Sequence, residues 1–235
     1  MSLELEHNNL PIHIGIIMDG NGRWATNQNM ERLSGHIQGV ETVRTIVEAC
    51  VRLKIPHLTL YTFSKENWQR PKDEISSLMS LLSSSLKNEL EKLNRNNIVL
   101  KIVGKLEDLP AELQALIMDV IESTKNNTGL VLTLALSYGG RQEIVDAINK
   151  IIASDNKHID EEIFKNYLYA PTMPDPDLII RTGGENRLSN FLLWQSAYSE
   201  IYVSKKNWPE FAEDDLISAL NDFGQRKRKY GKVLS

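Results

Sequence analysis

The chain has 235 residues, 41% of them hydrophobic and 25% charged, and its 27 Lys and Arg against 31 Asp and Glu give a formal net charge of −4. These proportions exclude collagen-like, disordered and disulfide-scaffold proteins, and also a polycation that coats nucleic acid. The single cysteine, Cys50, allows no internal disulfide, the N-terminus lacks the regions of a signal peptide, and no apolar run reaches the ~18 residues of a membrane-spanning helix. We therefore expect a cytoplasmic globular protein.

Apolar runs and helical patterns alternate along the chain. Six apolar runs predict buried strands at residues 12–18, 58–63, 98–103, 130–136, 178–180 and 200–203. Helical spacing predicts helices over about 40–53, 73–93, 141–153 and 212–229, and another opening at Pro110. After an N-terminal tail (1–10), this alternation predicts a single α/β domain over 11–230, with a six-stranded, mainly parallel sheet flanked by helices.

Polar segments follow four of these strands, at residues 19–24, 64–70, 138–141 and 181–189. Each segment contains an arginine, and three contain glycine pairs or near-pairs. In open α/β sheets the ligand lies outside the carboxyl ends of the strands, so these segments meet where a ligand binds. Positive charge and free backbone N–H groups gathered there predict a polyanionic ligand, with phosphate as the leading candidate.

One alternative rests on the stretch from Gly20 to Ala25, which fits the loose dinucleotide pattern G-x-G-x-x-[G/A] after a strand. A nicotinamide-dependent oxidoreductase therefore remains open. Against it, no acidic residue ends the second strand, and Asp19 would place a carboxylate beside the pyrophosphate. The sequence contains no P-loop, no zinc-ligand spacing and no Gly-x-Ser-x-Gly.

An acid beside an anion site is explained if Mg²⁺ lies between them, since Mg²⁺ favours one or two carboxylates plus phosphates. Asp19 is the first candidate ligand, and Glu200, at the start of the sixth strand, is the second. The predicted helix 73–93 carries leucines at helical spacing and the small residues Ser83–Ser85. Ordinary core packing accounts for that pattern, and so does the wall of an apolar channel for a long hydrocarbon.

Five segments closely resemble the cis-prenyltransferases, and most closely the bacterial undecaprenyl diphosphate synthases. They are residues 13–24, 35–39, 58–71, 138–141 and 177–195, and they occur in the family's order over almost the whole chain. The resemblance implies condensation of isopentenyl diphosphate onto an allylic (farnesyl-type) diphosphate, with Mg²⁺ and cis double bonds. It also implies a long-chain polyprenyl (undecaprenyl) diphosphate product, the precursor of a lipid carrier for cell-wall glycans, made in a hydrophobic product tunnel by a homodimer.

By position, the resemblance makes Asp19 the catalytic aspartate, Asn67 the proton acceptor, and Asp19 and Glu200 the metal ligands. An amide is a poor base, so transfer of the proton through water, Ser64 or the diphosphate is chemically more favourable than its uptake by Asn67. The allylic diphosphate site comprises Gly20, Asn21, Gly22, Arg23, Trp24, Arg32, His36, Ser64, Lys65, Glu66, Trp68 and Arg70. The isopentenyl diphosphate site comprises Arg181, Arg187, Leu188 and Ser189. The chain departs from some family members in having Asn186 where they carry histidine, so the resemblance assigns no ligand role to this position.

A non-enzyme alternative is a regulatory, prenyltransferase-like subunit. Such relatives have lost the first aspartate, whereas this chain keeps Asp19, Arg23, Asn67 and Arg181. The basic cluster 226–229 is compatible with nucleic acid or anionic lipid, and equally with a solvated helix end that complements the helix dipole. We expect no nucleic-acid partner, and at most a peripheral contact with the inner membrane face that helps product release.

Overall fold

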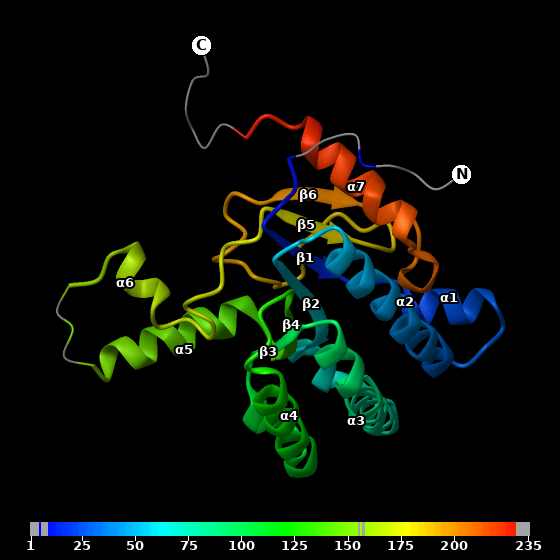
Figure 1. Ribbon diagram of the computed structural model, residues 1–235. Coiled ribbons are helices and arrows are strands. Elements are labelled where there is room, and N and C mark those ends of the chain that lie inside the picture. Colours follow the sequence, from blue (N-terminus) through cyan, green and yellow to red (C-terminus); the bar gives the residue numbers. More distant parts are fainter. Residues whose placement is uncertain (1–4, 6–8, 155, 157, 229–235) are drawn as a thin grey trace.

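A parallel sheet of six strands organises the part of the chain that the computed structural model describes, residues 5, 9–154, 156 and 158–228. Its strand order is β3-β4-β2-β1-β5-β6, and each neighbouring pair is parallel. The strands are β1 (His13–Ile17), β2 (His57–Ser64), β3 (Val99–Val103), β4 (Val131–Tyr138), β5 (Leu178–Arg181) and β6 (Glu200–Val203). Figure 1 shows their carboxyl ends pointing toward the side where α1 lies.

The helices are α1 (Asn21–Asn27), α2 (Arg32–Arg52), α3 (Lys72–Arg95), α4 (Ala111–Thr124), α5 (Gly140–Ile152), α6 (Glu161–Lys165) and α7 (Glu213–Gln225). Three short 3₁₀ turns are η1 (Lys65–Gln69), η2 (Leu106–Asp108) and η3 (Trp208–Glu210). In Figure 1, α7, α2, α3 and α4 follow one another across the sheet, and the larger apolar core lies beneath them. A smaller core on the other face includes Tyr138, Ile179 and Phe191.

The predicted architecture is confirmed: the described strands make one six-stranded, all-parallel sheet flanked by helices. The strand predictions hold because buried parallel strands read as continuous apolar runs, and the observed ends differ by two residues or fewer. Most of the predicted tail 1–10, and the end of the domain at 229–230, lie outside the described residues.

The prediction was wrong about the region after β1. A helix was expected from about residue 40, but α1 occupies Asn21–Asn27 and α2 already begins at Arg32. Glycines at 35 and 39 obscured the helical pattern, yet both serve close packing of α2 against α1. A Cβ atom at Gly35 would lie 2.0 Å from the carbonyl oxygen of Asn21, and one at Gly39 would lie 2.7 Å from the Asn21 Oδ1.

Two further corrections concern helix length and number. The last helix ends at Gln225 rather than at 229, because Arg226 adopts an extended conformation and pairs with Glu200 (2.8 Å) and Asp222 (2.5 Å). Lys229 lies outside the described residues. The short helix α6 was not predicted, and its first turn is capped by the side chain of Asp160. Within the described chain, we find no helix with both the length and the apolar character needed to cross a bilayer.

Candidate active site

A polar pocket of about 210 Å³ lies at the carboxyl end of β1, between α1, the start of α2 and Arg70. The residues that line it are Met18, Asp19, Gly20, Asn21, Gly22, Arg23, Arg32, His36 and Arg70. Asp19 is the predicted catalytic aspartate and metal ligand, and the others except Met18 belong to the set predicted to bind an allylic diphosphate. The fold thus brings residues as far apart in the sequence as Met18 and Arg70 into one pocket.

Asp19 is held as an anion at the edge of this pocket. Its Oδ2 accepts a hydrogen bond from Arg181 Nη2 (2.8 Å), and its Oδ1 lies 3.4 Å from Arg23 Nη2. Burial raises the pKa of Asp19, but the hydrogen bond and the charges of Arg181 and Arg23 outweigh it, so the net pKa lies below the usual value. The backbone N–H of Trp208 also donates to the Asp19 backbone carbonyl (3.0 Å). Both ends of the residue are therefore fixed.

The opposite wall of the pocket is cationic. Arg70 lies 3.2 Å and Arg32 3.8 Å from the carboxylate of Glu74, so two arginines share one acid. Burial lowers the pKa of His36 to about 4, with the charge of Arg70 acting in the same direction and Glu74 opposing it. With neutral His36 and more arginines than carboxylates, the pocket suits an anion such as a diphosphate.

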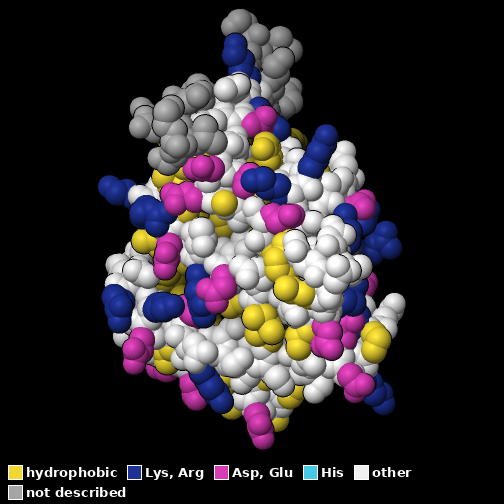
Figure 2. Space-filling model, turned by 90° about the vertical axis from the view of Figure 1, so that its right-hand side faces the viewer, with side chains coloured by type: hydrophobic (Ala, Val, Ile, Leu, Met, Phe, Trp, Pro, Cys, Tyr) yellow, Lys and Arg dark blue, Asp and Glu magenta, His cyan; other side chains and the backbone are white. Residues whose placement is uncertain are grey.

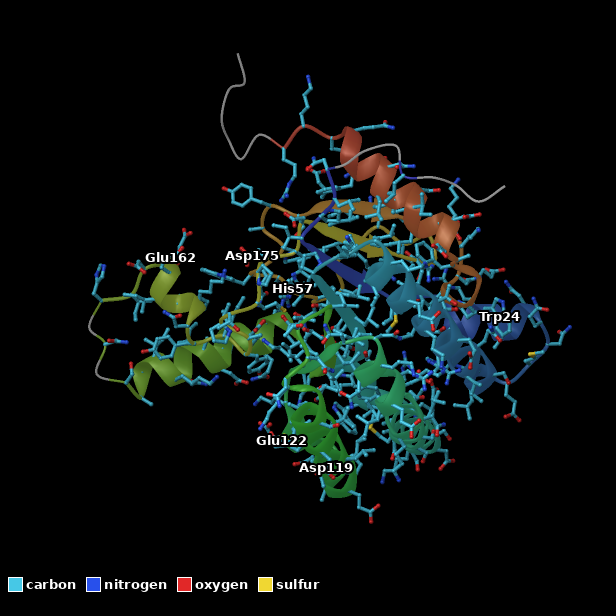
Figure 3. All side chains as sticks on the ribbon, in the orientation of Figure 1. Trp24, His57, Asp119, Glu122, Glu162 and Asp175 are labelled. Carbon is cyan, nitrogen blue, oxygen red and sulfur yellow. The ribbon has the colours of Figure 1, made fainter. Side chains whose placement is uncertain are left out.

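Because Gly20 and Gly22 have no side chain, the backbone there can lie close to Asn207 and to the Arg32 guanidinium. Gly20 has a φ of 105°, and a Cβ atom there would lie 2.5 Å from Asn207 Oδ1. A Cβ atom at Gly22 would lie 2.7 Å from Arg32 Nη1. Trp24 follows on α1 and is half-buried, and Figure 3 shows it on the opposite side of the view from Glu162 and Asp175.

An apolar cavity of about 250 Å³ opens directly from the polar pocket, since Met18, Asn21, His36 and Arg70 line both. It runs between α2, α3 and the sheet. Most of its other lining residues are apolar, for example Val43, Val47, Leu78, Leu82, Leu86, Leu93, Leu100 and Leu132. An anion site joined to an apolar cavity fits an amphiphile with a charged head and a hydrocarbon tail.

The η1 turn after β2 carries four of the predicted site residues, and hydrogen bonds hold it in place at several points. Asn67 Oδ1 accepts from the Ser64 N–H (3.1 Å), which caps the turn, and Asn67 also lines the apolar cavity. Glu66 accepts from Asn190 Nδ2 (2.7 Å). Because Asn190 Oδ1 also accepts from the Arg141 N–H (2.8 Å), the turn is linked to the start of α5.

Asp108, on η2, is a residue that sequence reasoning missed. Its Oδ2 accepts from Lys65 Nζ (2.8 Å) and from Ser137 Oγ (2.5 Å), and Ser137 Oγ accepts from Trp68 Nε1 (2.9 Å). Burial raises the pKa of Asp108, but these two hydrogen bonds bring it below the usual value. Asp108 follows no strand end directly and matches no motif, so only the folded chain reveals this link.

The loop after β5 is organised by buried Arg181. Its Nη1 donates to Ser189 Oγ (2.7 Å) and to the carbonyl of Arg187, while its Nη2 holds Asp19. Leu188 is half-buried against the smaller core. The Arg187 side chain is exposed and pairs with Glu185 (2.5 Å). Arg181 thus connects Asp19, at the edge of the polar pocket, with the loop expected to hold isopentenyl diphosphate, and Asn186 lies exposed in the same loop.

Glu200 is not brought to Asp19 within the chain. It opens β6 beside Leu178, whereas Arg181, which holds Asp19, is three residues further along β5 beside Val203. At ~3.3 Å per residue, Glu200 lies about 10 Å before the carboxyl edge. Its carboxylate pairs with Arg226 instead (2.8 Å). The expected pairing of Asp19 and Glu200 around one metal is therefore absent from this single chain.

The described residues contain no group of three or more His, Cys, Asp or Glu side chains that could enclose a metal ion. One ionised carboxylate at the rim of an anion pocket is a different arrangement, and it fits Mg²⁺ that arrives with phosphate oxygens and keeps several waters. The donor set around Asp19 fits a cation bound together with a diphosphate.

Comparisons with known proteins agree with this geometry. Residues 17–231 match the profile of the Prenyltransf family, described as "Putative undecaprenyl diphosphate synthase". The chain is 49% identical to an isoprenyl transferase of Clostridium tetani, over 98% of this chain and 92% of the relative. It is 51% identical to an isoprenyl transferase of Rickettsia felis, over 94% of each.

Two solved structures are also similar. The lavandulyl diphosphate synthase of Lavandula x intermedia, in complex with dimethylallyl diphosphate, superimposes with a TM-score of 0.91 and 34% identity, over 95% of this chain and 99% of that one. A probable undecaprenyl diphosphate synthase of Campylobacter jejuni gives 0.82 and 37%, over 96% and 100%. With the family profile and near-full-length relatives in agreement, the chain belongs to the undecaprenyl diphosphate synthase-like isoprenyl transferases, the cis-prenyltransferase family.

Proposed function

We propose that this enzyme condenses isopentenyl diphosphate units onto an allylic, farnesyl-type diphosphate, and that its product is a long-chain polyprenyl diphosphate of the undecaprenyl kind. The observation that carries the proposal is the cationic pocket that opens into an apolar cavity through shared residues. The Lavandula neighbour, in complex with dimethylallyl diphosphate, supports an allylic diphosphate as one substrate. Release of the product as a carrier precursor for cell-wall glycans belongs to the same proposal.

In this reaction the allylic diphosphate occupies the pocket between Arg23, Arg32 and Arg70, with its hydrocarbon tail in the apolar cavity. The allylic C–O bond breaks and diphosphate leaves. The terminal alkene carbon of isopentenyl diphosphate forms the new C–C bond, and a proton is lost from the allylic position that becomes part of the new double bond. The three guanidinium groups stabilise the charge that develops on the leaving diphosphate.

Isopentenyl diphosphate binds on the loop after β5, to Arg187 and Ser189, with Arg181 fixing both the loop and Asp19. The buried guanidinium of Arg181 contacts both Asp19 at the allylic pocket and the backbone carbonyl of Arg187 on the β5 loop. This contact supports a position for isopentenyl diphosphate, the nucleophile, next to the allylic carbon. Leu188 anchors the loop in the smaller core.

Asn67 serves this reaction best as a hydrogen-bond donor. Its Oδ1 is already used by the Ser64 N–H, so its amide N–H groups remain for a ligand in the cavity. A neutral amide does not take up a proton near pH 7. We therefore assign Asn67 to orienting the substrate, and proton removal to the diphosphate or a water near Ser64.

Mg²⁺ is the cofactor of the proposed reaction. Asp19 would hold it, and the ion would neutralise charge on the diphosphate as that group leaves. Glu200 faces Arg226 near the amino end of β6, so it remains a predicted ligand only for an assembly in which a second chain supplies it.

A homodimer is part of the proposal, because α5 exposes an apolar stripe. Val145, Ile148 and Ile152 are spaced three and four residues apart on this helix and are 50%, 44% and 75% exposed. Figure 1 shows α5 extending away from the sheet, so little of the chain covers it. On the face in Figure 2, hydrophobic side chains lie among charges of both signs, so this face is not uniformly basic.

An assay of radiolabelled isopentenyl diphosphate with farnesyl diphosphate and Mg²⁺ tests the proposal. We expect label in a hydrocarbon that chromatography resolves as a long-chain polyprenol after dephosphorylation. No incorporation would refute prenyl transfer, and a single condensation that stops at a short product would refute the long-chain assignment. A thermal-shift assay that compares NADH with farnesyl diphosphate plus Mg²⁺ tests the oxidoreductase alternative. Stabilisation by farnesyl diphosphate and not by NADH would contradict that alternative.

Ser85→Leu is expected to shorten the product. Ser85 lines the apolar cavity from α3, so a leucine there narrows the space for the tail, while the diphosphate pocket is untouched. Because each buried CH₂ favours the protein by about 0.8 kcal/mol, growth continues until it meets a steric limit. Chromatography of the dephosphorylated products gives the length distribution.

Ser84→Leu is the matched control. Ser84 is exposed and its hydroxyl donates to the Ser80 carbonyl (2.9 Å), so its side chain lies outside the cavity lining. We expect this variant to retain the wild-type distribution. Equal lengths from Ser85→Leu and the wild-type enzyme would place the channel wall elsewhere.

A further inference from the structure

The apolar cavity contains a charged pair that lies outside the diphosphate pocket. Arg70 and His36 line both the cavity and the diphosphate pocket. Among the described residues, the other Lys, Arg, His, Asp or Glu side chains that line the cavity are Arg44 on α2 and Glu89 on α3. Neither belongs to the segments that carry the family resemblance. Charged groups in an otherwise apolar wall need a reason, because burying them is costly.

The pair joins the two helices that form the wall. Arg44 Nε donates to Glu89 Oε1 at 2.6 Å, and Arg44 Nη1 donates to Glu41. Lys92 Nζ lies 3.5 Å from the other oxygen of Glu89. The side chains of Arg44 and Glu89 are 28% and 19% exposed, so the pair still keeps some contact with water.

The pair lies well away from the reacting end of the cavity. Arg44 is eight residues beyond His36 on α2, which is about 12 Å along a helix. Glu89 is one helical turn beyond Ser85 on the same face of α3. Apolar lining continues past it at Val47 and Leu93. A tail that grows past this point must therefore cover the pair before it gains further apolar contacts.

Covering the pair removes its remaining water. Hydrocarbon burial favours each added unit, but loss of hydration from a partly exposed ion pair opposes it, and the hydrocarbon supplies no hydrogen bonds in return. We propose that Arg44 and Glu89 form a polar stop that sets the product length. The inference rests on the proposed chain-elongating function and adds a specificity-determining pair to it.

The test is a double variant, Arg44→Met with Glu89→Met, which replaces the pair by unbranched apolar side chains that favour helices. We expect its products to be longer than those of the wild-type enzyme by one or more isoprene units, read by chromatography after incorporation of radiolabelled isopentenyl diphosphate. Circular dichroism melting verifies that the variant is folded.

The chain offers a matched control on the same helix. Arg52 on α2 pairs with Glu213 at the start of α7 (2.6 Å), and neither side chain lines the cavity. Arg52→Met with Glu213→Met loses the same charges and also an interhelical tie, and it should keep the wild-type product length. If it lengthens the product equally, the proposal is wrong, because loosening α2 would then explain the effect.

If the double variant does not fold, Arg44→Gln with Glu89→Gln replaces it, since these changes keep side chains that can still hydrogen-bond to each other while removing both charges. It should shift the distribution in the same direction. An unchanged distribution in the folded variant overturns the polar stop while leaving prenyl transfer intact. Absence of incorporation by the wild-type enzyme instead refutes the proposed function, so the two failures are distinguishable.

Discussion

Asp19→Ala is expected to lower kcat by ~10³-fold or more while the protein still folds. The carboxylate is ionised by its contacts with Arg181 and Arg23 and lies at the rim of the cationic pocket. Removing it takes away the carboxylate that we propose holds Mg²⁺ against a leaving diphosphate. Steady-state kinetics with both substrates and Mg²⁺ measures the loss.

The fold should survive because the backbone contacts of this residue do not depend on its side chain. The Asp19 carbonyl still accepts from Trp208 N–H and from the Thr182 hydroxyl (2.7 Å). Asp19→Asn is the matched control: it keeps an acceptor for Arg181 but loses the charge. It should be nearly as inactive as the alanine variant and melt closer to wild type. Activity within tenfold of wild type in either variant would contradict the catalytic role.

Most of the sheet could be predicted from the sequence, for a physical reason. A parallel strand buried on both faces is a continuous apolar run, as in 130–136, and its ends are marked by glycine or polar residues. The start of α2 could not be predicted in this way. Gly35 and Gly39 read locally as helix breakers, and their role becomes clear only when α1 packs against them.

The meeting of polar residues in one pocket was predictable because the carboxyl ends of parallel strands share one edge. Asp19 follows β1 and Arg70 follows η1 after β2, so strand order alone places them near each other. Glu200 shows the limit of that argument. It belongs to a strand, but it is the first residue of β6, and register places it about three residues from the carboxyl edge. The role of Asp108 could not be predicted from the sequence, because its ion pair with Lys65 depends on how the η1 and η2 turns fold against each other.

Arg187→Ala and Arg32→Ala are expected to separate the two diphosphate sites. Arg32 lines the polar pocket, whereas Arg187 lies exposed on the loop after β5 with only Glu185 as its ion-pair partner among the described residues. Arg32→Ala should therefore raise KM for the allylic substrate, and Arg187→Ala should raise KM for isopentenyl diphosphate. Loss of one charge-assisted contact costs about 1.5–3 kcal/mol, or roughly 10–150-fold.

The size of the split distinguishes a binding role from general damage. Arg187 is exposed, so its removal leaves no buried partner unsatisfied, and Arg181 keeps its hydrogen bond to the backbone carbonyl of residue 187. Arg32→Lys and Arg187→Lys are the controls, because lysine keeps the charge but not the planar fork, and each should recover part of the lost affinity. The KM values for each substrate, measured with the other saturating, give the comparison. Equal weakening of both substrates by both alanine variants would show that the two arginines serve one shared site, and would refute the division between the β1 pocket and the β5 loop.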